Sequence, residues 1–305
     1  MPTSNYPGGF AAGLTLRNVP LYENFGGNVF WVQSTTGSDS GKGTRDRPFA
    51  SINYALTRCT ANNGDVIMVK PLHVETVAAA GGLATGTVAG VTVVGCGRGS
   101  SRPNVNFTAT ASTATISAAN TMFRNILFTG GIDAVVSPLI VSAADCAFVD
   151  CELRDVTGQV TDFLLTTAAA NRLLISNLRY DGAAAAGTNA GIALVGGDGI
   201  VIDGLYMDGN FAVGGIDIRT TATTDLEVRN VGFRTRNAAD IFLVDTITAS
   251  TGQIGPNINL RLQDNAANIT EAITGATWVL YDPIYVVNLA GEKAMLINTT
   301  ASTDA

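Results

Sequence analysis

A short strand-like pattern recurs through most of this 305-residue chain and limits the folds that it can adopt. The stretch FRNILFTGG returns in related form as FVDCELRDV, LISNLRYDG, IVIDGLYMDG and EVRNVGFRT. Aligned on a small or polar central residue, the repeats are 25 to 30 residues apart, with centres at Gly95, Asn125, Asp150, Asn177, Gly204 and Asn230. Strand patterns that repeat at this period indicate a solenoid.

A second strand pattern precedes the first in most repeats, for example TATISAA, SPLIVSAAD, DFLLTTAAAN and AGIALVGGD. No helical pattern of about ten residues separates the two, which argues against β-α-β units. We therefore predict an all-β fold: a right-handed parallel β-helix of about seven or more coils, formed by one chain over residues 28–288.

The alternation within the repeat predicts which side chains point into the β-helix. Apolar residues flank each centre with period two, so they are expected in buried ladders: Ile175, Leu178, Ile202, Leu205, Val228 and Val231. Asn tolerates the left-handed backbone of a tight turn. Asn125, Asn177 and Asn230 are therefore expected to form an asparagine ladder from coil to coil.

The two ends of the chain lack the repeat. Residues 1–27 are expected to form an extended arm, and residues 289–305 a C-terminal tail. A short amphipathic helix, with Pro48 near its first turn and Phe49, Ile52, Leu56 and Cys59 on one face, is expected to cap the first coil. The arm contains apolar residues that we predict to be an attachment element: Phe10, Leu14, Leu16, Val19, Leu21 and Phe25. Alternatively, the arm folds back and caps its own first coil.

Charge and cysteine content narrow the functional classes. The net charge is −7 and no Lys/Arg cluster occurs along the sequence, so nucleic acid is not an expected partner. No apolar run is long enough to insert into a membrane, and the N-terminus lacks the pattern of a signal peptide. Four cysteines without a zinc or disulfide spacing are predicted to be free thiols, which fits a reducing cytoplasm: Cys59, Cys96, Cys146 and Cys151.

Two groups of charged residues are candidates for carbohydrate chemistry. One comprises Asp145, Asp150, Glu152 and Asp155 with Arg154; the other comprises Asp203, Asp208 and Asp217 with Arg219. Glu152 and Arg154 share one strand parity and align with Arg179, Tyr206, Asp181 and Asp208 of later coils. A mixed face of this kind is more simply a solvated or subunit-contacting surface, so no catalytic residue is predicted.

Other features also favour structural interpretations. The lone His73 has no partner motif, and the loop GSDSGKG lacks the closing Glu of a calcium site. Aromatic residues fall mostly at interior positions, without the exposed row that polysaccharide binders use. No cofactor and no metal site are therefore predicted.

The segment before the repeats resembles the first coil of pectin-lyase-like β-helix proteins. The resemblance rests on Gly37, Ser38, Asp39, Gly43, Thr44, Pro48, Phe49, Ser51, Ile52 and Ala55, followed by Gly64, Asp65, Ile67, Val69 and Pro71. It extends with the repeats over residues 28 to about 265. The fold that it implies hosts polysaccharide lyases and hydrolases. The glycine-containing arm and the chain length also resemble β-helix structural proteins of tailed bacteriophages.

Two functions compete on these grounds. The leading expectation is a non-enzymatic virion protein: a homotrimeric capsid decoration or short head projection, held through its arm to the major capsid protein or another virion protein. Its location would be the virion, assembled in the cytoplasm of the bacterial host. The alternative is a carbohydrate-binding or polysaccharide-degrading tailspike or fibre protein that binds a host surface glycan.

Overall fold

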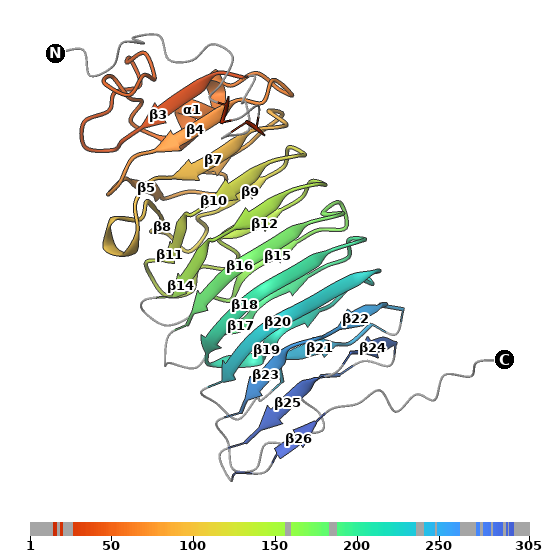
Figure 1. Ribbon diagram of the computed structural model, residues 1–305. Helices are drawn as coiled ribbons and strands as arrows, with labels where there is room; N and C mark the ends of the chain where they lie inside the picture. The colour runs from red at the N-terminus through yellow and green to blue at the C-terminus, as the bar shows by residue number, and fades with distance from the viewer. Residues whose placement is uncertain are drawn as a thin grey trace.

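Stacked parallel strands form an elongated β-helix in the computed structural model (Figure 1). The structure describes residues 15–16, 19–20, 27–155, 160–182, 188–235, 241–247, 249–262, 273–274, 277–281, 283–288, 291 and 293–295. Apart from the pairs β1–β2 and β25–β26, the strand pairs in this part of the chain are parallel, and the register shifts in one of them, β17–β19, between Thr188 and Ala190. This confirms the all-β prediction of a parallel β-helix with about seven coils.

A 17-stranded sheet makes up two rows of strands that meet at a turn. The first row contains β3 (Val29–Val32), β4 (Val66–Val69), β7 (Thr92–Gly95), β10 (Met122–Arg124), β13 (Ala147–Val149), β22 (Gly252–Ile254) and β24 (Trp278–Leu280). The second contains β5 (Val74–Val77), β8 (Asn104–Phe107), β11 (Leu127–Gly130), β14 (Glu152–Asp155), β23 (Ile258–Arg261) and β25 (Ile284–Val287). Three long strands span both rows: β16 (Leu174–Asp181), β18 (Val201–Gly209) and β20 (Leu226–Thr235).

A seven-stranded sheet closes the coil. It comprises β6 (Leu83–Ala84), β9 (Ala114–Ile116), β12 (Leu139–Val141), β15 (Asp162–Thr166), β17 (Thr188–Leu194), β19 (Phe211–Ile218) and β21 (Leu243–Asp245). The other elements are β1 (Thr15–Leu16), β2 (Val19–Pro20), β26 (Lys293–Met295), the 3-10 helix η1 (Gly99–Ser101) and the helix α1 (Ile52–Arg58). β26 pairs antiparallel with β25 and lies in the segment assigned to the C-terminal tail.

The turn between the two rows has the left-handed backbone expected from its asparagines. Asn125, Asn177 and Asn230 have φ values of +55°, +50° and +54°. Side-chain amides bond between coils, since Asn177 Nδ2 donates to Asp150 Oδ1 at 3.2 Å and Asn257 Nδ2 to Asn230 Oδ1 at 3.0 Å. The ladder is interrupted at Gly204, where a Cβ would lie 2.6 Å from Asn177 Oδ1.

The interior is apolar, as the period-two pattern predicts. Ile175, Leu178, Ile202, Leu205, Val228 and Val231 are all at most 2% exposed. Phenylalanines of neighbouring coils stack inside: the Phe123 and Phe148 rings lie 5.8 Å apart with an interplanar angle of 11°. Each coil leaves its apolar edge uncovered until the next coil stacks on it, so burial depends on the whole stack.

The helix α1 lies beside β3 and β4 at the N-terminal end of the stack (Figure 1). Ser51 is the N-cap, its Oγ accepting from Tyr54 N at 3.1 Å. The Glu75 carboxylate also accepts from Ile52 N at 2.7 Å. The capping helix is confirmed, but of the residues predicted on its face only Ile52 and Leu56 lie within it, because Phe49 comes before its start and Cys59 is its C-cap.

The other predictions for the two ends of the chain concern segments that are only partly described. Within the described residues, no helix has the length and apolar character needed to cross a membrane. In the arm only β1 and β2 are described, as strands without side-chain detail. The proposed attachment residues Phe10, Leu14, Leu21 and Phe25 lie outside the described residues, as do the side chains of Leu16 and Val19.

Candidate functional site

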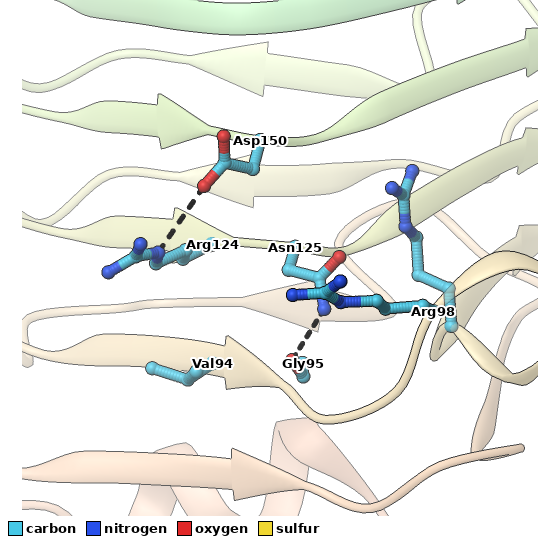
Figure 2. Close-up of a pocket in the computed structure, with 7 residues that line it drawn as sticks. Val94, Gly95, Arg98, Arg124, Asn125 and Asp150 are labelled. Atoms are coloured by element: carbon cyan, nitrogen blue, oxygen red, sulfur yellow. Dashed lines mark hydrogen bonds and ion pairs between the residues drawn. The ribbon is translucent and has the colours of Figure 1, made fainter.

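An arginine-lined cleft opens on the outer surface at the turn between the two strand rows (Figure 2). Its volume is about 480 Å³. It is lined by Val94, Gly95, Arg98, Arg102, Arg124, Asn125 and Asp150. Three cationic side chains and one carboxylate thus surround a space that is open to solvent.

Stacking of three consecutive coils brings these residues together. Val94 and Gly95 end β7, Arg124 ends β10, and Asp150 follows β13. The strands are in register, so Val94 lies opposite Arg124 and Arg124 opposite Val149. Gly95 is required here, because a Cβ would lie 2.1 Å from the Asn125 carbonyl oxygen.

The Asn125 amide fixes the floor of the cleft. Its Nδ2 donates to the carbonyl oxygens of Gly95 at 2.7 Å and Gly97 at 2.9 Å. Gly97, with φ +112°, leads the chain into η1, which is flanked by Arg98 and Arg102. The loop between the rows therefore places both arginines at the cleft, and Figure 2 shows Arg98 beside Asn125.

The charges in the cleft are incompletely neutralised. Arg124 Nε lies 3.4 Å from Asp150 Oδ2, and Arg102 Nη1 lies 2.9 Å from Glu152 Oε2. Arg98 is exposed and has no carboxylate partner among the described residues. An unpaired guanidinium beside two others makes the cleft attractive to an anion.

The first group of predicted charged residues is divided by the structure. Asp150 lines the cleft, and Glu152 lies next to it, where it pairs with both Arg102 and Arg154. Asp145 is paired with Arg172 at another turn. Asp155 is buried and accepts from Val160 N at 3.2 Å, so it does not join the others at the surface.

The second group is divided between the two sheets. Asp203 on β18 pairs with Arg229 at 3.0 Å, and Asp208 at the other end of β18 lies 3.6 Å from Arg234. Asp217 lies on β19 of the seven-stranded sheet, away from both. The sequence alignment of Glu152 with Arg179 and Tyr206, and of Arg154 with Asp181 and Asp208, is confirmed by the strand register.

Asp217 belongs to a three-residue ion cluster that the sequence did not reveal. Arg219 pairs with Asp217 at 3.1 Å and with Asp162, which is 55 residues away from Asp217 in the chain. Burial raises the pKa of Asp217, and Arg219 opposes this while Asp162 adds to it. Both carboxylates are largely buried and hold Arg219 between them, so the cluster offers little access to a ligand.

The remaining candidate groups have structural surroundings. His73 is buried, with Nε2 3.0 Å from Glu75 Oε2 beneath the capping helix. In the loop GSDSGKG, Asp39 Oδ1 accepts from Ala50 N at 2.9 Å. Within the described residues, no group of three or more His, Cys, Asp and Glu side chains could hold a metal ion. The four cysteines are free.

Sequence reasoning missed the arginines of the cleft. It sought runs of basic residues, whereas Arg98, Arg102 and Arg124 come from different parts of two coils. It aligned Tyr206 on an outer face but expected no exposed aromatic row and did not place Tyr285 there, whereas Tyr206 and Tyr285 are 45% and 52% exposed. The strand register is the signal that could have shown the arginine cleft and the second tyrosine. It would have had to be applied to every residue and not to the repeat centres alone.

Comparison with known proteins gives a likeness of fold. No family model matches the chain, and no curated protein matches it in sequence. Among solved structures, a rhamnogalacturonan lyase is similar to it, with a TM-score of 0.52 and 13% sequence identity. The match covers 90% of this chain and 86% of that chain. The likeness therefore extends over nearly the whole β-helix.

This finding corrects the leading functional expectation. The expected non-enzymatic virion protein is contradicted, because the similar structure is an enzyme named for a polysaccharide and nothing found points to a virion component. The alternative of a polysaccharide-degrading protein fits the finding better. The resemblance to pectin-lyase-like β-helices is supported for the fold, whereas a phage origin has no support.

Proposed function

We propose that this protein binds an acidic polysaccharide in the arginine-lined cleft and cleaves it by β-elimination. The observation that carries the proposal is the convergence of Arg98, Arg102 and Arg124 on one open cleft, with no carboxylate beside Arg98 in the described part of the chain. A guanidinium fork matches the two oxygens of a uronate carboxylate. Likeness of fold to a rhamnogalacturonan lyase supports the reaction class by analogy only.

The charges of the cleft suit the chemistry of elimination. In this reaction a base removes the proton on C5 of a uronate, a double bond forms between C4 and C5, and the glycosidic oxygen leaves C4. That oxygen then takes a proton from water. Negative charge builds up next to the uronate carboxylate, so Arg98 and Arg124 would lower the barrier by neutralising it.

Asp150 is the residue that we assign as the base. Among the described residues that line the cleft, Asp150 is the one that carries a carboxylate. Arg124 and the Asn177 amide hold it at the edge of the cleft, at 3.4 Å and 3.2 Å. A positioned carboxylate is a suitable proton acceptor once substrate lies within hydrogen-bond reach.

Direct binding and product formation test the proposal together. Purified protein is mixed with polygalacturonate, a neutral glucan or single-stranded DNA, and binding is measured by affinity electrophoresis. The ultraviolet absorbance of an unsaturated uronate reports elimination. We expect Arg98→Ala and Arg124→Ala to weaken polygalacturonate binding at least about tenfold, the loss expected when a charged hydrogen bond is removed.

The control is Arg172→Ala, which removes an exposed arginine at another turn. Equal binding by Arg98→Ala, Arg124→Ala and the wild type would overturn the assignment of the cleft. Tighter binding of DNA than of any acidic glycan would overturn the ligand class. Asp150→Asn separates binding from chemistry: it should retain polymer binding and lose the unsaturated product. Wild-type binding without that product would reject the cleavage step.

A further inference from the structure

A second groove lies on the outer face of the C-terminal half, on strands separate from the cleft. Two adjoining cavities of about 430 Å³ and 220 Å³ share Asn259 and Arg261. We call them together the tyrosine groove, defined by Tyr206, Gly232, Asn259, Arg261, Tyr285 and Lys293. Its strands β18, β20, β23 and β25 lie side by side in the lower half of the stack (Figure 1).

The groove follows one column of the strand register. Tyr206 pairs with Gly232, Gly232 with Asn259, and Asn259 with Tyr285. Three steps between adjacent strands, at about 4.8 Å each, place the tyrosine positions roughly 14 Å apart along the β-helix axis. That separation suits a short oligosaccharide lying lengthwise, with one sugar ring against each tyrosine.

The two tyrosines are exposed platforms and not part of the core. Tyr206 and Tyr285 are 45% and 52% exposed. The Tyr206 ring is held from one side by Arg179, whose guanidinium carbon lies 5.5 Å from the ring centre. The Cδ2 edge of the ring lies near Gly232, where a Cβ would be 3.2 Å away. A fixed, half-exposed aromatic ring offers an apolar face and a polar hydroxyl to a sugar.

Charge defines the ligand as anionic. The groove has cationic groups at Arg261 and Lys293 and at Arg234, which lies 3.6 Å from Asp208, and no acidic residue is among the described residues that line either cavity. Arg261 and Lys293 are exposed, and neither has an ion pair within the described residues. The whole chain carries a net charge of −7, so a cationic groove on it is a local feature.

We propose that the tyrosine groove is a non-catalytic binding site for an acidic oligosaccharide segment, which holds the polymer along the outer face. The site rests on the proposed function only for the class of ligand, an acidic polysaccharide. Tyr206 and Tyr285 stack on sugar rings, and Arg261 and Lys293 pair with carboxylates. Gly232 and Asn259 keep the floor between the tyrosines low.

Oligosaccharide binding tests the groove directly. A short oligogalacturonate is titrated into the full-length protein by calorimetry, with an uncharged oligoglucan of equal length as the comparison. Tyr206→Ala, Tyr285→Ala and Arg261→Ala should each raise the dissociation constant roughly three- to tenfold. The matched control is Tyr281→Ala, which removes an equally exposed tyrosine that does not line the groove.

A second variant avoids removing any contact. Gly232→Ile should weaken binding by filling the floor and pushing aside the Tyr206 ring, whose Cδ2 would lie 3.2 Å from the new Cβ; the backbone of Gly232 is not in the left-handed region, so the backbone accepts the side chain. Unchanged affinity in Gly232→Ile and both tyrosine variants would overturn the proposal, as would an equal loss in Tyr281→Ala. Equal affinity for the uncharged oligoglucan would overturn the anionic ligand.

Different experimental results would contradict the groove proposal and the cleft proposal. Groove variants should raise the KM for long polygalacturonate and leave kcat unchanged, whereas cleft variants should abolish product. If the groove binds oligogalacturonate while the wild type forms no product, the cleavage proposal fails and the groove stands. If Arg98→Ala abolishes product while the tyrosine variants bind normally, the groove fails and the cleft stands.

Discussion

The inner and outer faces of this β-helix are built from alternating residues of the same strands, yet they follow different rules. On β18, Leu205 points inward and is 1% exposed, while its neighbour Tyr206 points outward and is 45% exposed. Inward positions repeat apolar residues from coil to coil, because each must pack on the next. Outward side chains do not pack between coils, so their identity can differ from one coil to the next. The cleft and the tyrosine groove therefore do not disturb the stacking of the coils.

The largest expected effect comes from charging the inner face. Leu205→Asp places a carboxylate between Leu178 and Val231, its register partners in the buried apolar core. We expect the free energy of unfolding to fall by roughly 4 kcal/mol or more. Urea denaturation followed by circular dichroism measures the change.

The neighbouring outward position is the control for this prediction. Tyr206→Ser should lower the free energy of unfolding by about 1 kcal/mol at most, because the ring is half exposed. Similar losses in the two variants would show that the distinction between the faces has no energetic basis.

A second prediction concerns a buried carboxylate that is held by hydrogen bonds from neutral groups. Asp65 is 0% exposed, and its carboxylate accepts from Asn28 N at 2.6 Å, Thr60 N at 2.7 Å and Asn63 Nδ2 at 2.7 Å. Burial alone would raise the pKa of Asp65, but these hydrogen bonds outweigh it and lower the pKa below its usual value. Folding therefore favours the ionised form.

The lowered pKa of Asp65 gives a stability contribution that is present above the unfolded-state value of about 3.9 and lost as pH falls through the folded value. Asp65→Asn should cost about 1–3 kcal/mol at pH 7. The gap between variant and wild type should narrow below about pH 4. Urea denaturation at both pH values checks this, and a gap that stays constant would mean that the charge of Asp65 contributes nothing.

The inner face explains why the fold was predictable from sequence. Ile175, Leu178, Ile202 and Leu205 repeat at fixed spacing, and the turn asparagines mark where each coil bends. Because each coil must cover the apolar edge of its neighbour, the buried residues recur at a regular spacing along the sequence. The limits of α1 were less certain, because its start depends on the caps provided by Ser51 and Glu75, and Glu75 is distant in sequence.

The outer face explains why the candidate sites were not predictable. Arg98 comes from an irregular loop, while Arg124 ends a strand one coil later, so no local spacing joins them. Asp162 and Asp217 meet at Arg219 for the same reason. Tyr206 and Tyr285 are separated by Gly232 and Asn259 in the register, so the pair becomes visible once the coils are stacked.

The smallest expected effect comes from removing an exposed ion pair on the outer face. Arg172 Nε and Nη2 donate to the two carboxylate oxygens of Asp145 at 2.6 Å and 2.7 Å, and these bonds lower the pKa of Asp145. Both side chains are exposed, so water and salt screen the pair and side-chain entropy opposes it. We expect no measurable shift in the urea midpoint of Arg172→Ala at physiological salt.

A double-mutant cycle with Asp145→Asn, at low and high salt, isolates the pair. A loss comparable to that of Asp65→Asn would show that the outer face is also needed for stability, and the inference that its residues vary freely would fail.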